Sequence, residues 1–148
     1  MSDQATTSPA RTTMSAADRR EALIDCAHAL FFEKGYEPTT INDIIARAGV
    51  SKGGFYHHFA AKEELLETVV TRLLHAAIAE SATVLDEPGV DALTRLNRFF
   101  ERSVQWKMRT APKLRELTIA LLRPENYLLF QHLITAVSAA MEPVIARV

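Results

Sequence analysis

Two adjacent histidines, His57 and His58, are the first candidates for chemistry, because imidazole can bind a metal or transfer a proton. They lie in the segment GVSKGGFYHHFAAKEELL, whose apolar spacing is helical. Neighbouring side chains on a helix point about 100° apart, whereas metal-binding pairs on helices prefer residues four apart. The remaining histidines, His28, His75 and His132, are too scattered to complete a site. We therefore predict no metal site and no cofactor.

A single cysteine, Cys26, excludes an intramolecular disulfide and a zinc cluster built from cysteines. Its apolar helical surroundings favour a small buried side chain over a nucleophile. Cys26 and His57 have no third group at a spacing that would complete a nucleophile, base and orienter. The sequence therefore predicts a protein that is not an enzyme.

Charge and composition fit a protein without a membrane span. The chain has 148 residues, 48% of them hydrophobic, with 17 Lys and Arg against 18 Asp and Glu. A net charge near zero gives no field over the whole molecule, so any basic surface must be local. The N-terminus lacks the apolar region of a secretory signal, and no run of about 18 apolar residues occurs. We expect a reduced, cytoplasmic location.

An all-α chain in three parts is predicted from the apolar spacing. Residues 1–14 are rich in Ser, Thr, Ala and Pro and should form a disordered arm. Residues 15–61 should form a three-helix unit, and residues 62–148 a helical domain. The first helix should begin after Ser15 and end at a left-handed Gly35.

The second helix should begin at Thr40, with Asp43 completing a capping box, and Gly49 should end it. Ser51 should cap a third helix reaching Phe59.

The helical domain should contain helices from Lys62 to about Leu85 and from about Asp91 to Arg109, separated by the sequence DEPG. Pro112 and Pro124 each suit the first turn of a further helix. Pro143 should kink the last helix or end it early.

Two short helices joined by a three-residue turn have the proportions of a helix-turn-helix. Between Ile44 and Lys62 the sequence carries basic residues and no acidic one, which suits phosphate contacts. Gly53 and Gly54 would let the backbone approach DNA closely, or would simply continue the turn. Phe55 and Phe59 should face inward and support the third helix.

The segment YEPTTINDIIARAGVSKGGFYHHFAAKEELL resembles the DNA-binding region of the TetR (tetracycline-repressor-like) transcription regulators. The likeness covers about residues 17–75, with Ile45 where the family usually has Ala. The matching residues are Phe32, Gly35, Tyr36, Thr39, Thr40, Ile44, Ala48, Gly49, Val50, Ser51, Gly53, Tyr56, His58, Phe59, Lys62 and Leu65.

This resemblance implies a set of residues that bind double-stranded DNA. Thr40, Tyr56, His58 and Lys62 match phosphate-binding positions, and Lys52 is suited to guanine. His57 is either groove-facing or a backbone contact. The full set is Thr40, Asn42, Ser51, Lys52, Gly53, Gly54, Tyr56, His57, His58 and Lys62.

The resemblance also implies a homodimeric repressor that a small, often apolar effector releases from a palindromic operator. The residues that could line the effector pocket, unless they are plain core, are His75, Phe99, Phe100, Gln105, Trp106, Met108, Tyr127 and Phe130. Family members carry further helices that form the dimer interface, so the helical domain is expected to be incomplete at its C-terminus. The alternative is a truncated helical interaction module that keeps the fold without selective DNA binding.

Overall fold

The computed structural model describes residues 14–147, and of residues 111–113 only the backbone. All regular structure in this range is helical, as predicted. The predicted arm lies outside the described residues, except for Met14. The α-helices are α1 (Ala16–Lys34), α2 (Ile41–Ala48), α3 (Lys52–His58), α4 (Lys62–Ala82), α5 (Ala92–Leu121) and α6 (Tyr127–Ile145), with short 3-10 segments η1 (Thr83–Asp86) and η2 (Pro124–Asn126).

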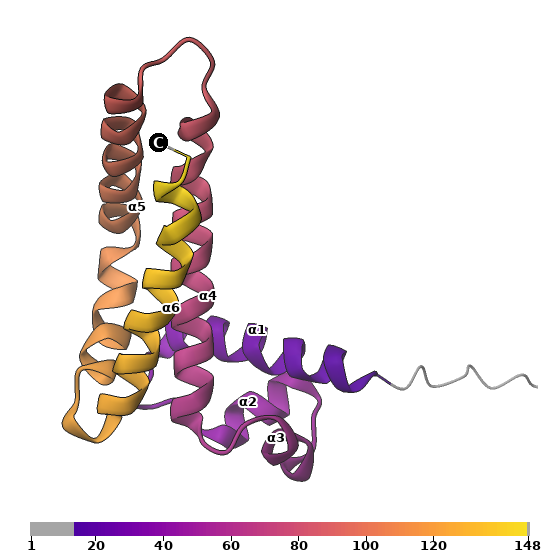
Figure 1. Ribbon diagram of the computed structural model, residues 1–148. Helices are drawn as coiled ribbons and strands as arrows, with labels where there is room; N and C mark the ends of the chain where they lie inside the picture. Colours follow the sequence, from indigo (N-terminus) through magenta and orange to yellow (C-terminus); the bar gives the residue numbers. More distant parts are fainter. Residues whose placement is uncertain (1–13, 148) are drawn as a thin grey trace, which may run out of the picture.

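Helix α4 is the central element of the molecule. It packs against α5 and α6 along its length and against α1 near its N-terminal end. Figure 1 shows α1 running across the foot of this upright bundle, with α2 and α3 below it. The three N-terminal helices therefore form a separate layer, and α4 connects that layer to the rest of the chain.

Local capping explains why the first three helices begin where they do. Ser15 with Asp18 and Thr40 with Asp43 form two complete capping boxes, and Ser51 caps α3 through the amide of Gly54. Gly49 ends α2 in the left-handed conformation, as predicted. Gly35 differs from the prediction, because its φ of 91° and ψ of 161° lie outside the left-handed helical region in a conformation open essentially to glycine alone.

One apolar core joins the two layers. Leu23, Ile24 and Ala27 of α1 pack with Leu65 and Leu66 of α4 in a cluster that extends to α5 and α6. This shared core fixes the angle at which α4 enters the N-terminal layer, because closely packed interiors deform little.

The boundary predicted at Pro112 is wrong: α5 is one helix, and its backbone continues through this residue. Helix α5 packs against α4 and η1. Tertiary packing can therefore keep it continuous despite the local penalty of proline. Pro124 does lie at the start of a helical segment, η2, which leads into α6. Pro143 lies inside α6, which ends two residues later at Ile145.

Two segments are long and apolar enough to cross a membrane by length and mean hydropathy alone. One is α4 with η1, and the other is η2 with α6. Neither contains a long uninterrupted apolar run. Core helices of globular proteins pass the same test. Helix α4 is such a core helix, because it packs against α1, α5 and α6. Helix α6 buries Leu133 and Val144 and leaves Leu128, Ile134 and Ile145 exposed.

Candidate nucleic-acid interface

The turn between α2 and α3 is fixed by a buried apolar residue and two backbone constraints. Val50 is buried, and its amide donates to the carbonyl of Ile45 at 3.1 Å. The left-handed Gly49 reverses the chain, and the hydroxyl of Ser51 accepts from the amide of Gly54 at 3.1 Å. The two helices therefore form a compact helix-turn-helix.

Helix α3 is held to the core by two phenylalanines, as predicted. Phe55 and Phe59 are 0% and 1% exposed, with ring centroids 6.0 Å apart. The opposite side of the helix is open to solvent, where Lys52 and His57 are exposed and Tyr56 is 51% exposed. An anchored helix with a polar outer face is what insertion into a DNA groove requires.

The two adjacent glycines have different surroundings. A methyl group at Gly53 would meet no atom within 4 Å, so no intramolecular contact requires glycine there. A methyl group at Gly54 would lie 2.8 Å from Cγ1 of Val50 and 3.2 Å from the hydroxyl oxygen of Ser51. Packing of the turn therefore explains Gly54, whereas no contact among the described residues requires glycine at position 53.

Of the basic residues expected to make this surface positive, two are engaged within the protein. Arg47 forms a two-pronged ion pair with Glu33 at 2.6 and 2.9 Å, which lowers the pKa of that carboxyl. The ammonium of Lys62 donates to two backbone carbonyls. Lys52 makes no ion pair with any residue in the described part of the chain.

Helix α1 contributes a positive charge that the sequence motif did not include. The guanidinium of Arg20 lies 5.1 Å from the ring centroid of Phe59, so α1 brings a cation next to α3. Arg20 also approaches Glu21 at 3.8 Å, in an exposed pair of little energetic weight. The sequence around Arg20 did not indicate this contact, because the contact depends on the packing angle between α1 and α3.

Three residues expected to contact phosphates line one hollow. Thr40, Tyr56 and Lys62 border a depression of about 370 Å³ between the start of α2, the end of α3 and the start of α4. The hydroxyl of Thr40 is engaged with Asp43 at 2.7 Å, and its amide donates to the same carboxylate at 2.8 Å. Asn42 is exposed in the first turn of α2, two residues after Thr40. Glu37 and Glu63 line the same hollow, so it carries carboxylates beside Lys62 and is open to solvent.

The two histidines differ as sharply as the two glycines. His57 is exposed, whereas His58 is half-buried, with its Nε2 atom covered and without a hydrogen-bond partner among the described residues. Burial lowers the pKa of His58, and the nearby His57, Arg19 and Arg20 lower it further. Burial therefore favours the neutral form of His58, and its Nε2 atom is covered in the free protein. No group of three or more potential metal ligands occurs in residues 14–147.

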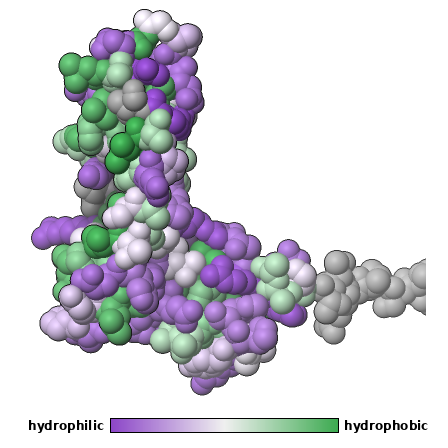
Figure 2. Space-filling model, in the orientation of Figure 1, coloured by the Kyte–Doolittle hydropathy of each residue, from purple (hydrophilic) through white to green (hydrophobic). Residues whose placement is uncertain are grey.

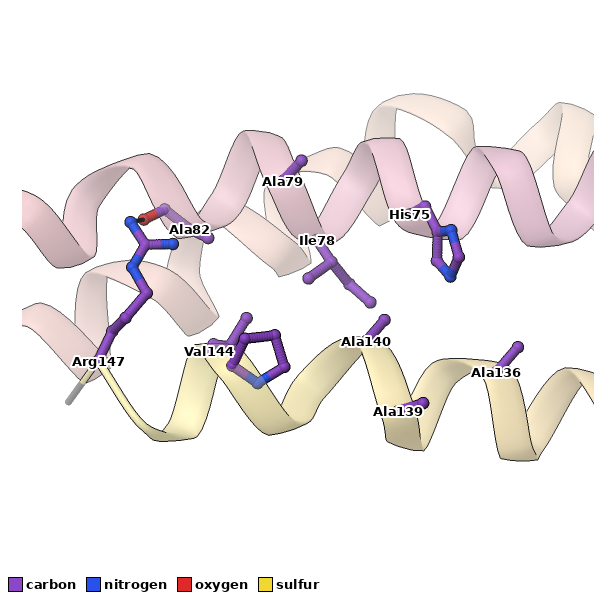
Figure 3. Close-up of a pocket in the computed structure, with 10 residues that line it drawn as sticks. His75, Ile78, Ala79, Ala82, Ala136, Ala139, Ala140, Val144 and Arg147 are labelled. Atoms are coloured by element: carbon purple, nitrogen blue, oxygen red, sulfur yellow. Dashed lines mark hydrogen bonds between the residues drawn. The ribbon is translucent and has the colours of Figure 1, made fainter.

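A groove of about 530 Å³ runs between α4 and α6. Figure 3 shows Arg147 at one end of the groove and His75 near the other, with Ile78 of α4 and Ala140 of α6 pointing toward each other between them. Arg147 pairs with Asp86 and donates to the carbonyl of Ala82 at 3.2 Å. The lining residues are His75, Ile78, Ala79, Ala82, Ala136, Ala139, Ala140, Pro143, Val144 and Arg147.

Only His75 of the predicted effector-binding residues lies in this groove. Phe99 is buried in the core, Phe100 and Gln105 lie on an outward face of α5, and Met108 is 74% exposed. Trp106 and Phe130 are half-buried, and Tyr127 is exposed. Phe99 and Phe100 are in edge-to-face contact, with ring centroids 5.5 Å apart, and Phe100 and Gln105 line one depression, but the predicted residues do not share a single pocket. Alanines make up half of the groove lining, and small residues of this kind carry no signal of a pocket in the sequence.

Sequence comparison with known proteins matches this chain to one family of bacterial regulators and to transcriptional repressors. Residues 23–69 match the family described as bacterial regulatory proteins, tetR family. The chain is 36% identical over 87 residues to the transcriptional repressor KstR2 of Mycobacterium tuberculosis, covering 59% of this chain and 43% of the repressor. It is 36% identical over 62 residues to the repressor BepR of Brucella suis, covering 42% of this chain and 30% of that protein. The chain thus spans less than half the length of these two relatives.

Similarity of structure extends further along the chain. A TetR family regulator, PfmR, from Thermus thermophilus superposes with a TM-score of 0.55 at 30% identity, covering 84% of this chain and 69% of that one. A regulator of Mesorhizobium loti gives a TM-score of 0.66 at 25% identity, covering 91% and 70%.

Proposed function

Because the chain belongs to the TetR family of bacterial transcriptional regulators, we propose that it binds a specific DNA sequence and represses transcription there. The observation that carries the proposal is the division of α3 into a buried face with Phe55 and Phe59 and an open face with Lys52, Gly53 and Tyr56. Lys52 would read a guanine, while Thr40, Asn42, Tyr56 and His57 would contact the backbone and the groove edge.

A homodimer would place two copies of α3 in successive major grooves, about 34 to 36 Å apart. A palindromic operator follows from that symmetry. Helices α5 and α6 and the connection between them expose apolar side chains, among them Ile119, Leu122 and Ile134. Figure 2 shows apolar patches among polar surface, both along the upper bundle and at its foot. The exposed apolar side chains of α5 and α6 support association through these helices.

The groove between α4 and α6 is our candidate for the effector site. Half of its lining residues are alanine, and polar groups lie at the ends, which suits an elongated apolar molecule. Helix α4 carries both His75 in the groove and Lys62 beside the DNA-facing hollow, about 20 Å away along the helix. A ligand that shifts α4 would therefore change the presentation of α3 and release the operator.

Fluorescence anisotropy with labelled duplexes, selected from random and genomic sequence, tests DNA binding. Lys52→Ala and Tyr56→Phe should weaken binding sharply, while Lys107→Ala, at an exposed lysine of α5, should leave it unchanged. Equal binding by all these variants would refute the role of α3. Sedimentation of the same samples would measure the oligomeric state.

The groove can be tested with the apolar dye anilinonaphthalene sulfonate as a probe. Ala140→Phe should fill the groove and abolish the rise in dye fluorescence, whereas Ala76→Phe, at an exposed site of α4 outside the groove, should not. An unchanged dye signal in Ala140→Phe would exclude the groove as the binding site.

A further inference from the structure

Lys62, expected from the sequence to bind a phosphate, is turned toward the protein. Its Nζ atom donates to the carbonyl oxygens of Tyr36 at 3.1 Å and Thr39 at 3.0 Å. The same ammonium lies 4.1 Å from the centroid of the Tyr36 ring. Two of its three hydrogens are thereby engaged, and the side chain is half-buried. To reach a phosphate, the Lys62 ammonium would have to break these two hydrogen bonds. Hydrogen bonds from a charged group are among the stronger ones in proteins.

The segment that Lys62 holds is the loop between α1 and α2. Thr39 in this loop is fully buried, and its hydroxyl donates to the carbonyl of Gly35 at 2.6 Å. The amide of Thr39 donates to the carbonyl of Tyr36 at 3.2 Å, so the loop closes on itself. The next residue, Thr40, is the N-cap of α2. The position of this loop therefore sets where α2 begins.

Two further contacts attach this loop to the bundle. The hydroxyl of Tyr36 donates to Glu63 of α4 at 3.2 Å. Glu37 forms an ion pair at 2.9 Å with Arg123, in the connection between α5 and α6. Lys62 and Glu63, the first two residues of α4, thus contact the loop on one side, and Arg123, just after α5, contacts it on the other. A movement of α4 or of the end of α5 would therefore be transmitted to the start of α2.

We propose that Lys62 is a positioning residue for DNA reading and not a phosphate ligand: it fastens the α1–α2 loop, and with it the start of α2, to α4. The inference rests on the DNA-binding function proposed above. A movement of α4 would then affect the DNA-binding surface in two ways. It would act on the N-cap of α2 through the loop, and on α3 through direct packing.

The dependence of affinity on salt separates the two roles of a lysine. Removing one lysine that binds a phosphate should reduce the slope of log affinity against log salt by about 0.9. Lys52→Met, the matched control on α3, removes a lysine proposed to read a guanine and should relax specificity at that base pair. Lys62→Met keeps the apolar stem and should lower affinity by about tenfold at every salt concentration, with the slope unchanged. A reduced slope in Lys62→Met would overturn the proposal.

Hydrogen exchange of the free protein tests the same contact without DNA. The amide of Ile44, which donates to the carbonyl of Thr40 at 3.2 Å, should exchange about tenfold faster in Lys62→Met, while amides of α5 keep their rates. Tyr36→Phe removes only the hydroxyl contact to Glu63 and should raise the exchange of Ile44 by a smaller factor, which keeps the test valid if Lys62→Met does not fold. Unchanged exchange in both variants would refute the proposal. If the wild-type chain bound no duplex selectively, the DNA-binding function would fail, and exchange would still test the contact.

Discussion

Replacing Gly53 with alanine should stabilise the free protein and weaken its binding to DNA. The added methyl group meets no atom within 4 Å, so it causes no clash in the folded chain. Glycine inside a helix costs about 0.5 to 1 kcal/mol relative to alanine. For a chain of this size the gain should raise the melting temperature by about 1 to 4 °C.

Gly54→Ala is the matched control, because the same methyl group one residue later would lie 2.8 Å from Cγ1 of Val50. Overpacking of this kind costs about 1 to 3 kcal/mol, which offsets or exceeds the gain in helix propensity. The melting temperature of Gly54→Ala should therefore equal or fall below that of the wild type, in contrast to Gly53→Ala.

Binding of a selected duplex, measured by anisotropy beside thermal melting, completes this test. If DNA approaches the backbone of α3 at Gly53, the methyl group should reduce specific affinity by about tenfold, comparable to a mismatched base pair. A Gly53→Ala protein that is more stable and binds the duplex as well as the wild type would show that no close approach occurs at this residue.

Three other changes give distinct outcomes. Phe55→Ala should cost about 3 to 5 kcal/mol, because the ring is fully buried, and should lower the urea midpoint while abolishing DNA binding. Burial and the neighbouring Glu63 raise the pKa of Tyr36, so the folded state favours the neutral phenol. The free energy of unfolding should therefore fall as the pH rises above about 10. Tyr36→Phe should reduce that loss, as measured by urea titrations. Burial lowers the pKa of His58, so the unfolded chain takes up the proton first; stability should fall as the pH drops below about 6.5, and His58→Phe should flatten that dependence in thermal melts at stepped pH.

Local signals in the sequence were sufficient for the N-terminal layer. Capping residues such as Ser15 and Thr40 act on the amides beside them, and Gly49 reverses the chain through its own backbone, so each could be identified without the fold. The inward direction of Phe55 and Phe59 followed from helical spacing and is confirmed.

Features that depend on distant segments could not be predicted in the same way. Lys62 contacts the carbonyls of Tyr36 and Thr39, residues more than twenty positions away along the chain. The continuity of α5 through Pro112 and the alanine-lined groove both depend on how α4, α5 and α6 pack. Pro112 predicted a helix boundary, and the aromatic residues predicted a pocket. In both places tertiary packing gave a different structure.

Selection of duplexes from a randomised library, followed by sequencing, tests the central claim most directly. The wild-type chain should enrich one motif, as a single half-site or as two half-sites about 10 base pairs apart. Lys52→Ala should lose that enrichment or relax it at the guanine that Lys52 reads. No enrichment by the wild type at low salt, or the same motif enriched equally by Lys52→Ala, would contradict the assignment of α3 as the DNA-reading helix.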